Sequence, residues 1–181
     1  IGIDSRYDAK TWFYAFIYGA GDAKLGMIVT KQQSPKKNAA LGKRLRSQFL
    51  ANLDAMGKLI AAIKTKARQH KRLRGLDGRP LHVRSEHSAP NTLMQSAGAV
   101  VMKKALLLFD ASLQAQGYIP GKDYEYVANA HDEWQVECRP ELAEEVGRLG
   151  VAAIRAAGEH FRFRCPLDGE FSVGTSWAST H

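Results

Sequence analysis

The pattern of apolar and polar positions over the first thirty residues predicts two helices joined by a glycine-containing turn. Ser5 and Asp8 have the spacing of a capping pair, which places the start of the first helix at Arg6. Gly19-Ala20-Gly21 ends this helix, because glycine favours the turn that follows a helix. Asp22 then begins a short second helix that reaches about Val29.

The next segment has the pattern of one long amphipathic helix. Ser34 and Pro35 form a favourable pair of N-cap and first-turn residues. One face of the predicted helix is strongly basic. The other carries apolar residues at helical spacing, namely Leu41, Leu45, Phe49, Leu53, Met56, Leu59, Ile60 and Ile63.

Residues 71–84 change from helical to strand spacing. Asp77-Gly78 lies between two short apolar segments and is a hairpin-turn signal. From Pro90 to about Gln116, a run rich in Ala, Leu, Val and Met predicts a largely buried helix that ends at Gly117.

The last third of the chain predicts a hairpin followed by a helix. Residues 124–130 and 133–138 are two short strands that flank His131-Asp132. In the second strand, Trp134, Val136 and Cys138 point one way, whereas Glu133, Gln135 and Glu137 point the other. A final amphipathic helix is predicted from Pro140 to about Ala157, and residues 161–173 are predicted to return as a closing strand.

Composition indicates a soluble globular domain. The 181 residues are 45% hydrophobic, enough for one sizeable core. No apolar run approaches the roughly 20 residues that cross a bilayer, and the N-terminus has neither Met nor a signal peptide, so no membrane partner is expected. Cys138 and Cys165 lack the neighbours of a zinc site, which favours a reduced, cytoplasmic location.

Charge is distributed unevenly along the chain. The net charge of +8 combines 20 Lys and Arg against 6 Asp and Glu in residues 1–104 with 6 against 12 in residues 105–181. A basic half favours a polyanionic partner, because neutralising phosphates releases their counterions. A solvated, Lys-rich helix surface explains the same composition, so charge alone leaves both interpretations open.

Four residues of the first helix form the strongest candidate binding surface. Arg6, Lys10, Tyr14 and Tyr18 recur at four-residue steps, which drift only about 40° per step and so share one helical face. The cations suit phosphates, and the aromatic rings suit a sugar or base. A surface helix with a half-buried aromatic edge has the same spacing.

A second candidate site is the turn His131-Asp132-Glu133. A carboxylate on a tight turn suits Mg²⁺, which prefers oxygen ligands and usually has one or two protein carboxylates plus substrate phosphates. Taken alone, the tripeptide is weak evidence, and an ordinary hairpin turn is the simpler interpretation.

The order and spacing of these motifs resemble those of the family A (DNA polymerase I type) DNA polymerases. Arg6-x-x-x-Lys10-x-x-x-Tyr14-x-x-x-Tyr18-Gly19 resembles the family's fingers-helix motif, and residues 20–26 resemble the podophage replicative branch. His131-Asp132-Glu133 is similar to its palm motif. The resemblance runs from about Arg6 to His181.

The segment between the two motifs also resembles the family. Gly75-Leu76-Asp77-Gly78-Arg79 and the residues from His82 to Gly98 are similar to its hairpin and to the helix along the primer–template minor groove. In the family, Asn91 and Gln95 would reach acceptors that all base pairs share in that groove. Without the resemblance, they are a helix cap and a surface amide.

The resemblance implies a role for each of these residues. Arg6 and Lys10 would hold the triphosphate of an incoming deoxynucleotide, Tyr14 would pack on its sugar, and Tyr18 would lie beside the templating base. Asp132 would bind metal, with Glu133 as an auxiliary carboxylate, and Lys10 would also assist catalysis. The residues expected to contact DNA are Arg79, Arg84, His87, Asn91, Gln95 and His131.

The implied fold is α+β, with fingers helices in residues 1–70 and the C-terminal part of an antiparallel palm sheet in residues 71–181. The family's second metal-binding aspartate, as well as its thumb, would precede residue 1. The complete enzyme would hold two Mg²⁺ ions, so we expect the isolated chain to be inactive without an upstream polymerase segment on the same or a separate chain.

The sequence therefore predicts a DNA-directed DNA polymerase that acts on primer-template DNA and deoxynucleoside triphosphates. If the gene belongs to a phage or prophage, the protein would lie in the bacterial host cytoplasm. The alternative is a non-catalytic DNA-binding remnant, or a subunit of a split polymerase.

Overall fold

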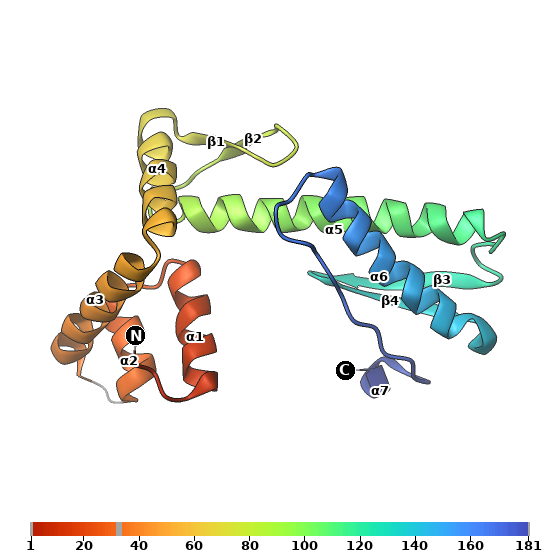
Figure 1. Ribbon diagram of the computed structural model, residues 1–181, viewed down its shortest axis with the longest axis horizontal. Helices are drawn as coiled ribbons and strands as arrows, with labels where there is room; N and C mark the ends of the chain where they lie inside the picture. The colour runs from red at the N-terminus through yellow and green to blue at the C-terminus, as the bar shows by residue number, and fades with distance from the viewer. Residues whose placement is uncertain (1, 32–33, 181) are drawn as a thin grey trace. The chain divides into compact units, whose positions relative to one another are not determined.

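A computed structural model describes residues 2–31 and 34–180, so His181 of the predicted C-terminal match lies outside the described residues. The chain is α+β and falls into two compact units, Ile1–Gln95 and Ser96–His181, with the boundary inside one helix. Figure 1 shows the elements: α1 (Arg6–Ile17), α2 (Asp22–Thr30), α3 (Pro35–Asn52), α4 (Asp54–His70), β1 (Arg72–Arg74), β2 (Pro80–His82), α5 (Ala89–Ala115), β3 (Tyr124–Ala130), β4 (Glu133–Cys138), a 3₁₀ turn (Pro140–Leu142), α6 (Ala143–His160) and α7 (Trp177–Thr180).

The two N-terminal helices confirm the sequence analysis. The Ser5 hydroxyl accepts a hydrogen bond from the Asp8 backbone N–H at 3.3 Å, as an N-cap residue does. The end of α1 is a Schellman motif, because the Gly19 N–H donates to the Phe16 carbonyl and the Ala20 N–H donates to the Ala15 carbonyl. Gly19 has φ +80°, the left-handed conformation that this motif requires.

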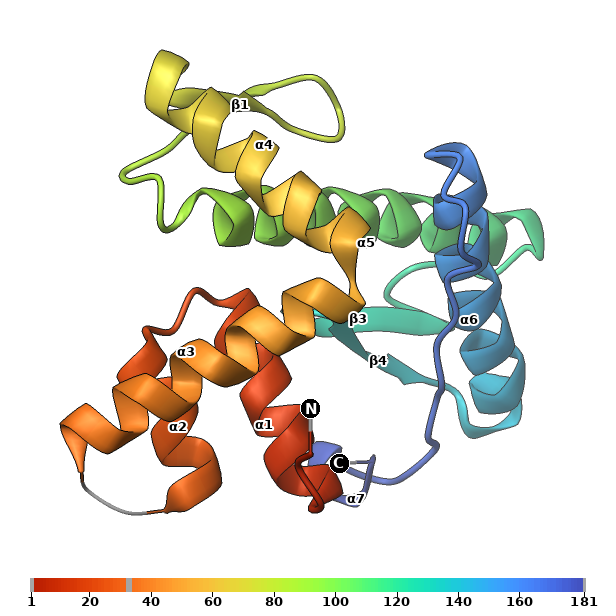
Figure 2. The same cartoon turned by 60° about the vertical axis from the view of Figure 1, so that its left-hand side comes forward.

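The long helix predicted after Pro35 is wrong in one respect, because the chain forms two helices. Leu53 has φ −130° and ψ 61° and separates α3 from α4, and Figure 2 shows the change of direction between them. The apolar stripe serves two different cores. Leu45 packs with α1 and α2, whereas Ile63 packs with the hairpin, and Leu53 and Leu59 remain exposed.

Two glycines let α2 and α3 approach until their backbones touch. A Cβ atom on Gly26 would lie 1.9 Å from the carbonyl oxygen of Asn38, and one on Gly42 would lie 1.9 Å from that of Asp22. These positions therefore require glycine for space rather than for backbone conformation. Around the crossing lies an apolar core built on Trp12, Phe16, Leu25 and Leu45.

The hairpin predicted around Asp77-Gly78 is confirmed. β1 and β2 pair antiparallel, with Arg72 opposite His82 and Arg74 opposite Pro80. A small core built on Ile63, Ala67, Leu73, Val83 and Ala89 joins the hairpin to α4 and to the start of α5.

Helix α5 matches the predicted range, but the expectation that it is largely buried is wrong. Val101, Ala105, Phe109 and Leu113, four residues apart, are buried, whereas Leu107 is 68% exposed. In this structure β3, β4 and α6 cover one side of the helix. The sequence predicts no apolar run long enough to cross a bilayer, but α5 is long and apolar enough by length and composition alone. Core helices of soluble proteins meet the same criterion.

Strands β3 and β4 have the predicted bounds and pair antiparallel, with a register shift between Tyr126 and Ala128. As predicted, Trp134, Val136 and Cys138 face the core. Trp134 stacks on Phe109 of α5, with 5.5 Å between ring centroids. The predicted C-terminal helix is α6, preceded by a 3₁₀ turn at Pro140–Leu142.

The closing strand predicted at residues 161–173 is wrong, because this described segment is irregular and packs on α6. Phe171 lies against Gly147 and Leu167 lies against Gly158, both in α6. The Arg155 guanidinium donates to Asp168 at 2.9 Å. These contacts hold the segment to a helix instead of a sheet edge, and Pro166 has no N–H for a strand ladder.

Candidate functional site

Helix α1 presents the four predicted binding residues on its exposed side. Arg6 and Lys10 are exposed, Tyr14 is 47% exposed and Tyr18 is 52% exposed. The two tyrosine rings are stacked with 6.2 Å between centroids. Arg6 and Lys10 make no hydrogen bond or ion pair with any residue that the structure describes, so both cations remain available for a ligand.

The buried side of α1 fixes the direction of this stripe. Trp12 and Phe16 are 1% and 5% exposed and stack on each other, and Phe49 of α3 packs edge-on against both. Rotating the helix would expose these rings, at a cost of about 1.5–3 kcal/mol for each large apolar side chain. Burial on one face therefore holds the stripe on the other.

The turn after α1 is held by side chains from two other segments. The Arg46 guanidinium of α3 donates to the Ala20 carbonyl at 2.6 Å and to Asp22 Oδ1 at 2.7 Å, and it lies over the Phe16 ring at 5.5 Å. His87 Nε2 contacts the Gly19 carbonyl. The structure thus places His87, predicted to contact DNA, beside the turn that follows Tyr18.

The predicted acidic turn lies at the tip of the β3–β4 hairpin. Ala130 pairs with Glu133, so His131 and Asp132 form a two-residue turn, with His131 at φ +51°. Both turn residues are exposed. Glu133 is half-buried and accepts a hydrogen bond from the Gln135 amide at 2.5 Å.

The donor set of this turn suits a hard cation only in part. Asp132 and Glu133 provide the oxygen ligands that Mg²⁺ prefers, and Asp132 projects from the turn toward solvent. Among residues 2–31 and 34–180, no group of three or more His, Cys, Asp or Glu side chains is arranged to hold a metal ion. The turn thus fits one or two protein ligands of an ion whose other ligands come from elsewhere.

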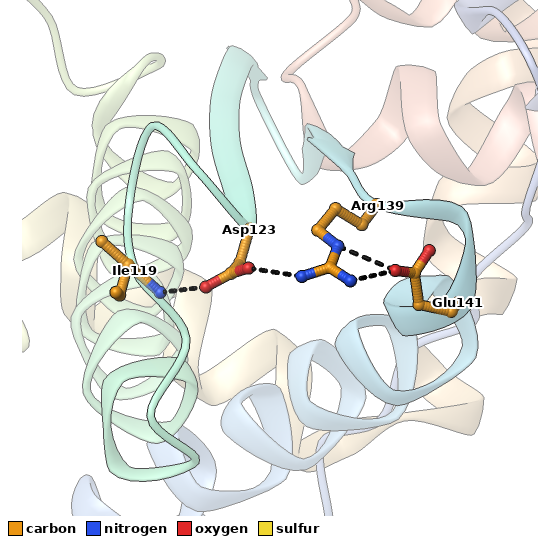
Figure 3. A network of polar contacts seen from close by, with 4 residues as sticks. All are labelled: Ile119, Asp123, Arg139 and Glu141. Atoms are coloured by element: carbon orange, nitrogen blue, oxygen red, sulfur yellow. Dashed lines mark hydrogen bonds and ion pairs between the residues drawn. The ribbon is translucent and has the colours of Figure 1, made fainter.

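A polar network at the other end of the hairpin was not predicted from the sequence. Figure 3 shows Asp123, which accepts a hydrogen bond from the Ile119 N–H at 2.8 Å and one from Arg139 Nη1 at 3.1 Å. Arg139 also pairs with Glu141. The Ile119 hydrogen bond, followed by that from Arg139, holds the pKa of Asp123 below its usual value. Asp123 precedes β3 and Arg139 follows β4, so the network joins the two strand ends.

The other residues predicted to contact DNA have different environments. Arg84 and Gln95 are exposed. Arg79 forms an ion pair with Asp77 at 2.5 Å, and the buried Asn91 Oδ1 has no hydrogen-bond partner among the described residues. These residues, with Gln95 as the last of them, belong with the α1 stripe to the first compact unit, whereas the acidic turn belongs to the second.

Comparison with known proteins decides the family. Residues 1–179 match the sequence model of DNA polymerase family A. The chain belongs to this family. The DNA-directed DNA polymerases of Enterobacteria phage T3 and Escherichia phage T7 are each 38% identical over 99% of this chain, which corresponds to 27% of each relative.

The chain is also similar to a more distant relative and, in fold, to a solved structure. DNA polymerase I of Aquifex aeolicus is 28% identical over 96% of the chain and 30% of its own length. The polymerase domain of Pol1 from M. smegmatis, solved with primer-template DNA and a deoxynucleoside triphosphate, has the same fold at a TM-score of 0.74. It is 19% identical, over 97% of this chain and 31% of that one. The chain therefore spans about a third or less of the length of these relatives.

Proposed function

We propose that this chain forms the nucleotide-binding face and part of the metal site of a polymerase that carries out template-directed DNA synthesis. The family match over almost the whole chain carries the proposal, and the exposed cations and stacked tyrosines of α1 support it. The relatives are named DNA-directed DNA polymerases, and primer-template DNA with a nucleotide is bound in the M. smegmatis complex. We propose the same partners for this chain, in the cytoplasm of a bacterial host.

The residues of α1 then act on the incoming deoxynucleotide. Arg6 and Lys10 bind its triphosphate, Lys10 also stabilises the charge that develops during transfer, Tyr14 packs on the sugar, and Tyr18 lies beside the templating base. The primer 3′-hydroxyl attacks the α-phosphate, a new phosphodiester bond forms, and pyrophosphate leaves. Holding the reactants in this geometry removes much of the entropic barrier.

The acidic turn supplies the protein ligands for a divalent cation. Asp132 would bind Mg²⁺, Glu133 would assist it, and His131 would lie near the primer terminus. Bound Mg²⁺ neutralises phosphate charge and orients the attacking and leaving oxygens. Two such ions would need more carboxylates than the turn provides, so we propose that an upstream polymerase segment, in the same or a separate chain, provides the second aspartate.

On the DNA side, His87, Asn91, Gln95, Arg79 and Arg84 would lie along the primer-template duplex. Gln95 would donate to minor-groove acceptors, whose arrangement is shared by all base pairs. The two arginines would contact phosphates, which position a duplex without reading its sequence.

Primer extension tests this function. The purified 181-residue chain should bind nucleotide but extend no primer, and adding the upstream segment should restore magnesium-dependent synthesis. Asp132→Ala should abolish that synthesis and retain DNA binding, because a metal ligand is lost rather than a phosphate contact.

The matched control is Glu137→Ala, which removes an exposed carboxylate from β4 away from the turn and should extend primers normally. Extension by the chain alone that disappears in Asp132→Ala would contradict the proposed upstream ligand. Near-normal extension by reconstituted Asp132→Ala would place the metal site elsewhere.

A further inference from the structure

The turn between α1 and α2 has contacts that the proposed roles of α1 do not explain. Tyr18 directly precedes Gly19, the glycine of the Schellman motif, and Ala20 directly follows it. Of the four residues in the α1 stripe, Tyr18 is therefore the one that a movement of this turn would displace most.

Arg46 joins this turn to the helices behind it. Its Nε donates to Asp22 Oδ1 at 2.7 Å, and its Nη2 donates to the Ala20 carbonyl at 2.6 Å. The guanidinium also lies over the ring of Phe16 in the last turn of α1. One planar group thus contacts α1, the turn and α2 together, and its rigid fork suits this better than a flexible ammonium would.

The glycine crossing explains why Arg46 reaches this position. Gly42 of α3 lies directly against the Asp22 carbonyl, and Arg46 is one helical turn further along the same face. The Arg46 side chain is 25% exposed, so it is largely enclosed in the contact. Because backbone meets backbone at Gly42, small movements of α3 pass directly to the turn.

We infer that Arg46 is a positioning residue for nucleotide selection, because it holds the turn that sets where Tyr18 lies. This inference rests on the proposed function of the α1 stripe and deepens it. The proposed site assigns Arg46 no contact with nucleotide or metal. Arg6 lies twelve residues before Tyr18, about 18 Å along the helix axis, so loss of Arg46 should affect base selection more than triphosphate binding.

The test compares Arg46→Ala with Arg44→Ala in the reconstituted polymerase. Arg44 is an exposed residue of the same helix, and it makes no hydrogen bond or ion pair with the described part of the chain, so it is a matched loss of charge. Arg46→Ala should lower the ratio of kcat/KM for the matched over the mismatched nucleotide about tenfold, the effect of losing a charged hydrogen bond. Arg44→Ala should leave this ratio within about twofold of wild type.

Two further variants separate positioning from general loss of stability. Arg46→Lys keeps the charge but loses the fork that reaches Ala20 and Asp22 together, so its selectivity should be intermediate. Asp22→Asn keeps an oxygen that can accept a hydrogen bond from Arg46, so it should retain most of the wild-type selectivity. If Arg46→Ala does not fold, Arg46→Lys carries the test. Hydrogen exchange on the 181-residue chain gives a readout that is independent of activity. The Ala20 amide should exchange faster in Arg46→Ala than in wild type, and at the wild-type rate in Arg44→Ala.

The outcomes distinguish this inference from the proposed function. If Arg6→Ala and Lys10→Ala weaken nucleotide insertion but Arg46→Ala selects nucleotides as Arg44→Ala does, the role of Arg46 is wrong and the function stands. If Arg6→Ala and Lys10→Ala insert nucleotides normally, the proposed function of α1 itself is wrong.

Discussion

Tyr14 and Tyr18 have the same side-chain type and lie one turn apart, but the proposed site gives them different roles. Both rings are about half exposed and stack on each other, yet the proposed site places one beside a sugar and the other beside a base. Their hydroxyls are therefore expected to matter differently.

The first prediction concerns the Tyr14 hydroxyl. By resemblance to family A, a tyrosine hydroxyl at this position helps to accommodate a sugar that lacks its 3′-hydroxyl. Tyr14→Phe should therefore reduce incorporation of dideoxynucleotides relative to deoxynucleotides, measured by competitive primer extension in the reconstituted enzyme. Tyr18→Phe makes the same chemical change one turn away and should keep the wild-type ratio. Equal ratios for wild type and Tyr14→Phe would exclude this role.

A second prediction follows from the lowered pKa of Asp123. A depressed pKa in the folded state means that the carboxylate adds stability above its unfolded pKa of about 3.9 and loses it as pH falls through the folded value. Asp123→Asn should therefore unfold at lower denaturant than wild type at pH 7. The difference should shrink as pH falls below about 4, where wild type loses its advantage. Urea titrations at both pH values measure this, and an unchanged difference would assign the loss to packing.

Sequence reasoning singled out the α1 stripe and the acidic turn, both of which are exposed, but it missed the contacts of Arg46, Asp123 and Arg139. The four-residue spacing of α1 and the turn at His131-Asp132 are local signals, and the structure places both on exposed surfaces. Arg46 and Asp22 are 24 positions apart, and Asp123 and Arg139 are 16 apart. Partners at such separations meet only through the fold, so no local pattern indicates them.

At the scale of elements, the boundaries that local signals determine were predicted well. The capped start of α1, the Asp77-Gly78 hairpin and the strands beside His131-Asp132 all form as expected. The break at Leu53 has no proline or glycine to mark it and follows from packing against two separate cores. The segment 161–173 has strand-like composition, but its Leu167 and Phe171 side chains pack against glycines of α6 instead.

The crossing of α2 and α3 gives a third prediction. Gly42→Ala should destabilise the chain by ~2–3 kcal/mol, because the new methyl group would overlap the Asp22 carbonyl and a well-packed contact would have to open. Gly57→Ala in α4 is the matched control, since its nearest neighbours would be 3.9 Å away. It should add ~0.5–1 kcal/mol through helix propensity. Thermal melts compare the two, and equal effects would contradict the proposed close approach.

At the scale of the whole molecule, charge is divided along the chain: residues 1–104 are net basic and residues 105–181 are net acidic. The first group includes the α1 cations, Arg79 and Arg84, whereas the second contains the acidic turn. In the proposed enzyme, the first part would supply most of the attraction for phosphates and the second the ligands for cations.

A fourth prediction follows from this distribution. The affinity of the chain for duplex DNA should fall steeply with salt and depend little on sequence, with a logarithmic slope of about −0.9 for each phosphate neutralised. Arg84→Ala should reduce the slope by about one unit, whereas Arg148→Ala, paired with Glu145 in the acidic part, should not change it. Fluorescence anisotropy over a range of salt concentrations measures this. Salt-independent or sequence-specific binding would contradict the proposed DNA surface.

The two-residue turn between β3 and β4 also limits how this part of the protein can evolve. Adding or deleting one residue in either strand would exchange the sides that face Phe109 and solvent. Substitutions can accumulate at exposed strand positions such as Glu125 and Glu137, but single-residue insertions and deletions in either strand should be purged. Length variation among descendants of this gene should instead accumulate in the irregular segment after α6, where no strand register has to be kept.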